Sequence, residues 1–518
     1  MSISSKDSLD PAGGRTGGDP RRWKALAVLT AVQFMLMLDV TVVNIALPNI
    51  QDDLGFSTEG LAWVVNGYLL MAAGFLLLGG RIADLLGRRR VFVTGVLLFG
   101  VSSIMCGAAN SPGLLVAGRF LQGFGEALAA PAALGLIAVL FTDSKERAKA
   151  LGIWGGLAAL GGAVGSVVGG LVTDFIDWRW VFYINIPIVV LALLMIPRLM
   201  PESRMARRDG QSLDLVGAVT VTGGLVAVVY GLLEAAEDSW GSSNVLLPLA
   251  GGIAALIFTA VWESRVPEPM IPLRFFNNRT RVTSNVVSMM SFASFYTYAF
   301  VATLFLQQVL DYSPMETGLA YIPLTIATGV GMGVSTALMP RIGVKPLVVI
   351  AFFGSALGQF IAASGFAPDA SYVGGVMPGL VVFALFNGMG FPVLINGGLH
   401  EVTGQDAGLA SGVQTSMQQI GAALGLATLV PVALRYITDH AGDGNPAAVA
   451  SDGFALALYV GAGVLAAAGV IALFLLGQVS AEKRDAHAEA AGVLAEEAPA
   501  VETTEVRTQS PTNQTAKA

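Results

Sequence analysis

Long apolar runs follow one another along most of the chain, separated by short polar segments. A helix needs about 20 consecutive apolar residues to cross the hydrocarbon core of a bilayer. The runs therefore predict about fourteen membrane spans, with approximate limits 25–48, 61–80, 91–109, 113–141, 150–173, 178–197, 213–234, 244–263, 282–310, 318–339, 346–365, 373–399, 410–435 and 454–477.

Arg and Lys are confined almost entirely to alternate loops between these spans. One set of loops contains Arg81, Arg88, Arg89, Arg90, Lys145, Arg147, Lys149, Arg198, Arg204, Arg207, Arg208, Arg265, Arg274, Arg279, Arg281, Arg341 and Lys345. The other set contains only Arg179 and Arg435. Because loops rich in Lys and Arg stay in the cytoplasm, we expect a multi-pass protein of the cytoplasmic (inner) membrane. An even number of spans then leaves both termini in the cytoplasm.

Composition also indicates a membrane protein. Of the 518 residues, 54% are hydrophobic and 13% are charged, whereas about 25% of residues are charged in a typical soluble protein. The 63 glycines allow helices to approach each other closely. Cys106 is the only cysteine and the three histidines are scattered. We therefore expect no internal disulfide, no metal site and no nucleic-acid partner.

The chain divides into tails, two halves and a middle segment. Residues 1–24 and the acidic residues 478–518 read as disordered cytoplasmic tails. The loop GRIADLLGRRR at 80–90 has a degraded echo in LMPRIGVKP at 338–346. This repeat predicts two six-helix halves, 25–197 and 282–477, separated by two extra helices with flanking loops in 198–281. Repeated halves are typical of secondary transporters, which bind substrate between them near the midplane.

One carboxylate stands inside the first predicted span, in the stretch LDVTVVNIALP. A charge in hydrocarbon costs at least about 3 kcal/mol, so Asp39 needs a partner, water, a proton or a function. In the fourth span, Arg119, Gln122, Gly123 and Glu126 share one helix face. Counting ~1.5 Å per residue places Asp39 and Arg119 at similar depths in the outer half of the bundle, where they could meet.

Several motifs together resemble one family. They are the span-one stretch around Asp39, the loop Gly80–Arg89, the span-four stretch GRFLQGFGEAL and the span-five stretch GGLAALGGAVGSVVGG. They look like motifs of the major facilitator superfamily, and within it of the fourteen-spanner branch of drug:proton antiporters. The resemblance implies an all-α fold of two pseudo-symmetric six-helix bundles plus two additional transmembrane helices.

The loop after span two looks like the superfamily's signature loop. Gly80 and Gly87 are expected to allow tight turns, and Asp84 to cap a helix or pair with Arg88 or Arg89. A pairing formed in only one conformation would act as a latch on alternating access. The alternative is that these arginines only set the topology.

The resemblance also suggests roles within spans one and four. It makes Asp39 the proton carrier, with Thr41 and Asn44 as polar support and Pro48 closing the helix, and it associates Arg119 with proton transfer. Glu126 departs from the family, which usually has a small residue there. Glu126 could carry a second proton or meet a cationic substrate, or it could be a structural partner for Arg119 or for a polar group on another span.

Span five carries two stripes of small residues, Gly161, Gly165 and Gly169 on one side and Gly162, Ser166 and Gly170 on the other. It resembles the superfamily's antiporter motif, but Ser166 stands where that motif usually has Pro. Close helix packing explains the glycines equally well. Residues that could line a drug pocket, or else only pack, are Asn44, Gln122, Tyr296, Tyr298, Gln414 and Gln418.

These features favour a proton-coupled antiporter that exports hydrophobic, cationic drugs or antibiotics by alternating access. It would need no cofactor, because the proton gradient drives it, and by resemblance it would be monomeric in the bilayer. An importer, or a lipid or siderophore transporter on the same scaffold, is the alternative, and a membrane sensor is a weaker one. The sequence contains no GxxxxGK[ST] or HExxH motif, so we do not expect an enzyme or ATPase.

Overall fold

The computed structural model describes residues 21–141, 143–200, 214–235, 238–266, 269–402, 407–442 and 444–477. Helices and their connections make up this part of the chain, with no strand among the described residues. Both predicted tails, apart from the first helical residues, lie outside the described ranges. So do Arg204, Arg207 and Arg208 of the positively charged loops.

Fourteen helical segments of the described chain are long and apolar enough to cross a membrane. The N-terminal bundle contains α1 (Arg21–Leu54), α2 (Thr58–Leu86), α3 (Arg88–Gly107), α4 (Pro112–Leu140), α5 (Ser144–Phe175), α6 (Trp180–Tyr183) and α7 (Asn185–Leu199). The C-terminal bundle contains α10 (Arg279–Leu304), α11 (Pro314–Ala320), α12 (Ile322–Ile342), α13 (Val344–Ser364), α14 (Met377–Gly398), α15 (Ala407–Asp439) and α16 (Pro446–Leu475). Three short elements are η1 (Leu273–Asn277), η2 (Phe305–Val309) and η3 (Tyr372–Val376).

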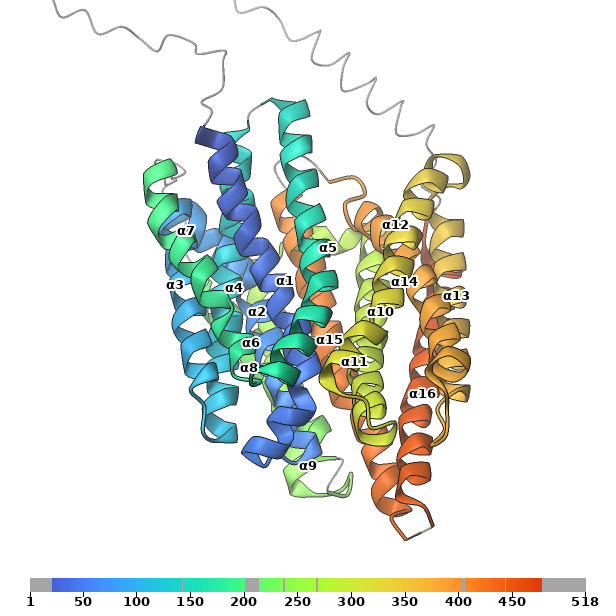
Figure 1. Cartoon of the computed structure of the whole chain (residues 1–518). Helices are drawn as coiled ribbons and strands as arrows, with labels where there is room; N and C mark the ends of the chain where they lie inside the picture. Colours follow the sequence, from blue (N-terminus) through green and yellow to red (C-terminus); the bar gives the residue numbers. More distant parts are fainter. Residues whose placement is uncertain are drawn as a thin grey trace, which may run out of the picture.

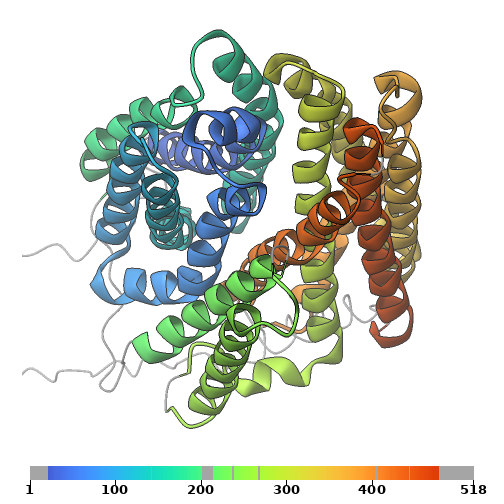
Figure 2. The same cartoon turned by 90° about the horizontal axis from the view of Figure 1, so that it is seen from below.

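The two bundles stand side by side (Figure 1). The extra helices α8 (Leu215–Glu234) and α9 (Ser243–Glu263) pack on each other, and α8 also contacts α2 of one bundle and α15 of the other. Seen along the helices, the pair lies beside the seam between the bundles (Figure 2). The predicted architecture of two bundles plus two extra helices is therefore confirmed.

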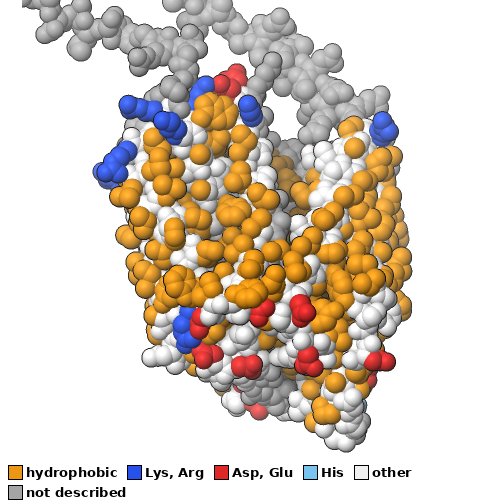
Figure 3. All heavy atoms as spheres, in the orientation of Figure 1, with side chains coloured by type: hydrophobic (Ala, Val, Ile, Leu, Met, Phe, Trp, Pro, Cys, Tyr) orange, Lys and Arg blue, Asp and Glu red, His pale blue; other side chains and the backbone are white. Residues whose placement is uncertain are grey.

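Charge is concentrated at the two ends of the molecule. A broad band of hydrophobic side chains separates them, with most of the visible Lys and Arg at one end and most of the visible Asp and Glu at the other (Figure 3). The described parts of the predicted Lys- and Arg-rich loops lie at the end where α1 begins and α16 ends, which we call the basic end. The band fits a protein surrounded by lipid over most of its height.

The first helix differs from its predicted limits at both ends. It begins at Arg21, inside the predicted tail, and it continues through Pro48 to Leu54. The prediction that Pro48 closes the helix is wrong. Proline removes one hydrogen bond from a helix, and Pro48 is buried within the bundle, where packing of the surrounding turns outweighs that single loss.

Two further local predictions change. Gly80 lies inside α2, so it does not form a turn, because the helix continues for six residues beyond it to Leu86. Gly87 does separate two helices, with φ of 111°, a conformation that favours glycine. The sixth span, predicted as one run, is divided at Ile184 into α6 and α7.

Candidate functional site

An ion pair lies buried in the N-terminal bundle. Arg119 Nη1 donates to Asp39 Oδ2 at 2.6 Å, and the side chains are 1% and 0% exposed. The contact joins α4 to α1, as expected from the similar depths of the two residues in the sequence. Because α1 extends to Leu54, Asp39 lies near the middle of its helix, whereas the shorter predicted span placed it in the outer half.

Two amides complete the surroundings of the Asp39 carboxylate. Asn185 Nδ2 donates to Oδ1 at 2.8 Å, and Gln122 Nε2 donates to the same oxygen at 3.3 Å. Gln122 is held in turn by Ser103 Oγ at 2.8 Å. Asn185 is the first residue of α7, so the division of the sixth span coincides with this contact. Each oxygen of the buried carboxylate therefore has a donor, as buried charges require.

The guanidinium of Arg119 has partners besides Asp39. Its Nε donates to the Val64 carbonyl at 2.8 Å, and its Nη1 donates to Gln122 Oε1 at 2.9 Å. The ring of Tyr68 lies 4.4 Å from the guanidinium carbon, in range of a cation–π interaction. Arg119 is therefore oriented by α2 and by its own helix, and it would keep these contacts if Asp39 lost its charge.

Glu126 lies two turns along α4 from Arg119 and is only 4% exposed. Its Oε2 is buried with no hydrogen-bond partner among the described residues. The side chains of Tyr68 in the N-terminal bundle and Gln419 in the C-terminal bundle face it, and Tyr296 of α10 is within electrostatic range. Glu126 is thus placed where the two bundles meet, between a side chain of each bundle.

The predicted latch residues form contacts within the N-terminal bundle. Arg88 pairs with Asp84 at 2.8 Å and donates to the Gly135 carbonyl of α4 at 3.0 Å. Arg89 donates to the Met200 carbonyl at 2.8 Å. The expected pairing of Asp84 with an arginine is therefore present, and it ties the loop to α4 and to the end of α7.

The two small-residue stripes of α5 face different neighbours. The backbone of α1 packs tightly on Gly161, Gly165 and Gly169, and a Cβ on Gly169 would lie 2.9 Å from Val42 Cα. On the other stripe, the backbone of α11 contacts Ser166 and Gly170. The helix runs unbroken from Ser144 to Phe175, so it is continuous at Ser166. The stripes pack α5 between α1 of its own bundle and α11 of the other.

Thr41 and Asn44 do not support Asp39. Thr41 Oγ1 donates to carbonyls of its own helix. Asn44 Nδ2 instead crosses to the C-terminal bundle, donating to the Ala299 carbonyl at 3.3 Å and to Thr303 Oγ1 at 3.2 Å. The reason is helical geometry, because Asn44 lies more than one turn beyond Asp39 toward the end opposite the basic end.

The remaining predicted pocket residues are divided between the seam and the core. Tyr296 is half-buried and stacks on Phe292. Tyr298 is fully buried against Phe383 inside the C-terminal bundle, at a ring-centroid distance of 4.7 Å. Gln414 donates to Ser288 Oγ at 3.5 Å within the same bundle, whereas Gln418 is half-buried. Tyr296 is also within electrostatic range of Glu126 and Arg119.

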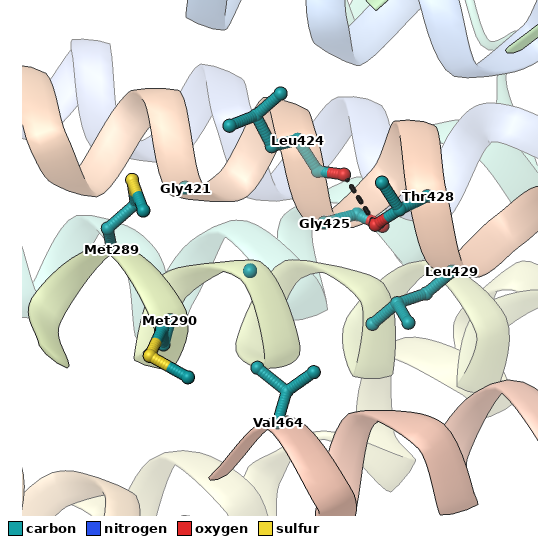
Figure 4. Close-up of a pocket in the computed structure, with 9 residues that line it drawn as sticks. Met289, Met290, Gly421, Leu424, Gly425, Thr428, Leu429 and Val464 are labelled. Carbon is teal, nitrogen blue, oxygen red and sulfur yellow. Dashed lines mark hydrogen bonds between the residues drawn. The ribbon is translucent and has the colours of Figure 1, made fainter. Parts of the chain in front are cut away.

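A cavity of about 120 Å³ lies apart from this cluster, between α10, α15 and α16 (Figure 4). Met289, Leu424 and Val464 contribute to its apolar wall. Thr428 is the polar side chain in this wall, and its hydroxyl donates a hydrogen bond to the Leu424 carbonyl. The cavity is therefore a packing gap inside one bundle and offers no charged group to a substrate.

Sequence reasoning identified Asp39, Arg119, Gln122 and Glu126, but it assigned no role to Asn185. Asn185 falls in the apolar stretch WRWVFYINIP. A polar amide within a predicted span is unusual, and on that ground the sequence could have marked Asn185 as a candidate. Its partner could not be read from the sequence, because 146 residues separate it from Asp39.

Comparison with known proteins decides the family. The family model described as Major Facilitator Superfamily matches residues 29–426. The chain belongs to the Major Facilitator Superfamily. It is 41% identical to the puromycin resistance protein of Streptomyces alboniger, over 89% of this chain and 92% of that protein. It is also 36% identical to the cephamycin export protein of Amycolatopsis lactamdurans, covering 85% and 89% of the two chains.

Solved major facilitator structures share the fold. A bacterial homologue of the human lysosomal transporter Spinster aligns with a TM-score of 0.60 at 18% identity, covering 89% of this chain and 98% of the other. A D-xylose–proton symporter aligns with a TM-score of 0.61 at 15% identity, covering 88% and 98%. Membership of this family implies transport across a membrane rather than catalysis.

Proposed function

We propose that the protein is a proton-coupled antiporter that exports hydrophobic, cationic antibiotics or drugs by alternating access. The names of its relatives support drug export, since they describe puromycin resistance, cephamycin export and lincomycin resistance. The positive-inside rule supports placement in the cytoplasmic membrane with the basic end inside. We further propose that it acts as a monomer and uses no cofactor.

The observation that carries the proposal is the buried ion pair between Asp39 and Arg119. Protonation would remove one charge of the pair, while the Val64 carbonyl and Gln122 still accept hydrogen bonds from Arg119. Arg119 therefore keeps hydrogen-bond partners whether Asp39 is charged or neutral. Asp39 can then gain and lose a proton in each cycle without leaving a buried guanidinium unpaired.

Coupling needs two states and a ligand that distinguishes them. In the proposed cycle, a proton arriving from outside neutralises Asp39, favours release of the cationic substrate and returns the protein to its inward-facing state. The Asp84–Arg88 pair holds the loop between α2 and α3 in the present state, and we propose that it acts as a latch on this switch.

Uphill export by purified protein in vesicles, with a pH gradient and no ATP, tests this function. Asp39→Asn is expected to reduce export against the gradient to the level of protein-free vesicles, because the amide cannot exchange a proton. Asp52→Asn is the matched control, since Asp52 is an exposed carboxylate on the same helix, and it should export normally. If Asp39→Asn protein at normal levels still exports uphill, Asp39 is not the carrier.

The same vesicles distinguish the alternatives. Accumulation in the opposite direction would favour an importer, and export only of lipids or siderophores would change the substrate class. A panel of monovalent cations, divalent cations and neutral drugs identifies the preferred substrate. Preference for neutral compounds would contradict the cationic part of the proposal.

A further inference from the structure

A second cavity, of about 240 Å³, lies where both bundles meet the two extra helices. Its walls come from α2, α8, α9, the segment before α10, and α15, and most of them are apolar, including Leu77, Leu225, Leu256 and Ile420. It is nearer the basic end, because it reaches the last residue of α9. It is distinct from the Asp39 cluster, which belongs to α1, α2, α4 and α7.

Glu263 is the one charged residue in the cavity wall among the described residues. Its carboxyl group accepts from the Ile271 backbone N–H at 3.4 Å, and the Met270 backbone N–H and the Asp214 side chain are also within hydrogen-bonding range. The Ile271 contact is long for a charged acceptor. Glu263 therefore stands at the end of an apolar cavity and is the charged group that the described wall offers to a ligand.

Asp214 lies beside Glu263 and is 5% exposed. Its Oδ1 caps α8, accepting from Gly217 N at 2.8 Å and from Trp262 Nε1 at 2.9 Å. Its Oδ2 is buried and has no hydrogen-bond partner among the described residues. Half of this carboxylate is thus fixed by the fold, and the other half is available.

Gly217 brings the two acids together. A Cβ there would lie 2.6 Å from Asp214 Oδ2 and 2.9 Å from Glu263 Oε1, so both oxygens converge on the same small patch. No described Lys or Arg forms an ion pair with either carboxylate. Adjacent carboxylates repel unless a proton or a cation lies between them.

We propose that this cavity is a second binding site, for a lipophilic organic cation taken from the adjacent leaflet. The positive group lies against Asp214 and Glu263, and the hydrocarbon body fills the apolar cavity. A metal ion would have to give up bound water molecules, and the cavity walls offer few oxygen ligands to replace them. An anionic lipid headgroup would be repelled by the two acids, and an uncharged chain would leave only a shared proton between them, whereas an organic cation can replace that proton and fill the apolar cavity.

The position of the cavity indicates what the site does. α2 and α15 belong to opposite bundles, and Ser416 Oγ of α15 donates to the Ala73 carbonyl of α2 at 3.0 Å beside the cavity. Gln419, three residues after Ser416, faces Glu126 on the other side of this seam. The second site therefore lies next to the central cluster and loads cations toward it. This role rests on the proposed export function.

Protection of an introduced thiol tests the site in the full-length protein. Cys106 is the only native cysteine, so Cys106→Ser gives a background without thiols. Leu256→Cys then places a thiol in the cavity wall, and Ile253→Cys places one on the same helix at a position 52% exposed. The probe is decyltrimethylammonium, the reagent is a membrane-permeable maleimide, and decanol and decyl sulfate are the ligand controls.

Decyltrimethylammonium at ten times its Kd is expected to slow labelling at position 256 by about tenfold and to leave position 253 unchanged. Decanol and decyl sulfate should protect neither position. Glu263→Gln and Asp214→Asn should each remove the protection, with labelling at 253 unchanged as evidence of intact folding. Equal protection by decanol, or protection that survives both acid substitutions, would overturn the proposal.

Asp39→Asn separates this inference from the proposed function. In that variant we expect protection at position 256 to persist while uphill export is lost. Normal export of cations without protection at position 256 would contradict the second site and leave the proposed export function standing. Protection at position 256 without any export would support the second site and contradict the proposed antiport.

Discussion

At the scale of single side chains, Glu126 differs from Asp39 and Arg119 in how its buried polar atoms are satisfied. Asp39 and Arg119 form an ion pair with each other, whereas Glu126 keeps one buried oxygen without a hydrogen-bond partner among the described residues. An unsatisfied buried acceptor costs about 1–3 kcal/mol. A cost of that size at the seam between the bundles favours a role in binding a proton or a cation over a purely structural one.

Glu126→Gln is expected to change which cations are exported while leaving proton coupling partly intact, because Asp39 and Arg119 are untouched. The loss should be at least about tenfold for the best cationic substrate, equivalent to ~1.4 kcal/mol, and small for neutral drugs. Resistance profiles of cells expressing equal amounts of protein measure it.

Glu401→Gln is the control for Glu126→Gln, since Glu401 is an exposed loop residue. It should leave the profile unchanged. If Glu126→Gln also leaves the profile unchanged, Glu126 is a structural partner rather than part of the binding site.

At the scale of elements, α5 shows how glycine spacing is converted into packing. One stripe admits the backbone of α1, and the other admits α11 of the opposite bundle. Small residues let helix backbones approach closely, so α5 packs directly on a helix of each bundle. The stripes were visible in the sequence, but only the fold shows that the second one crosses the seam.

Gly165→Ala is expected to destabilise the protein by about 1–3 kcal/mol, because the added methyl group would overlap the Thr41 side chain of α1. Gly162→Ala, one turn away, has nothing within 4 Å of its new methyl group. It should be neutral or stabilising by up to about 1 kcal/mol, since alanine favours a helix. Thermal unfolding in detergent measures both, and equal melting temperatures for the two variants would contradict the packing assignment.

At the scale of the whole molecule, contacts at the end opposite the basic end join the two bundles. Gln307 Nε2 donates to the Ile45 carbonyl at 3.0 Å, and Gln308 Nε2 donates to Gln51 Oε1 at 3.2 Å. Asn44 adds its bonds to α10 nearby. In alternating access such contacts exist in one state and break in the other.

Gln307→Ala is expected to shift the molecule toward the state in which this end is open, because it removes a part-buried hydrogen bond between the bundles. A thiol introduced by Thr303→Cys, at a fully buried position of α10, should then react about fivefold faster with an impermeant maleimide added outside, equivalent to ~1 kcal/mol.

Gln308→Ala removes an exposed bond for which water competes, so its effect on the same labelling should be smaller. Unchanged labelling in the Gln307→Ala protein would show that this contact does not hold the bundles together.

The fourteen spans could be predicted because hydropathy is a property of consecutive residues, and a bilayer selects length and apolarity directly. Helix ends were less predictable. α1 continues beyond Pro48 and the sixth span divides at Ile184, because packing in the bundle decides whether one lost hydrogen bond or one bent turn is tolerated.

The sequence by itself determined the number of spans, the asymmetry of charge, the polar face of α4 and the presence of an acid that needs a partner. Tertiary structure decided the partners. Asn185, Val64 and Tyr68 meet Asp39 and Arg119 from helices distant in the chain, and Asp214 meets Glu263 over Gly217. Periodicity states which residues share one helix face, but which faces meet depends on how the helices pack, and no local pattern records that.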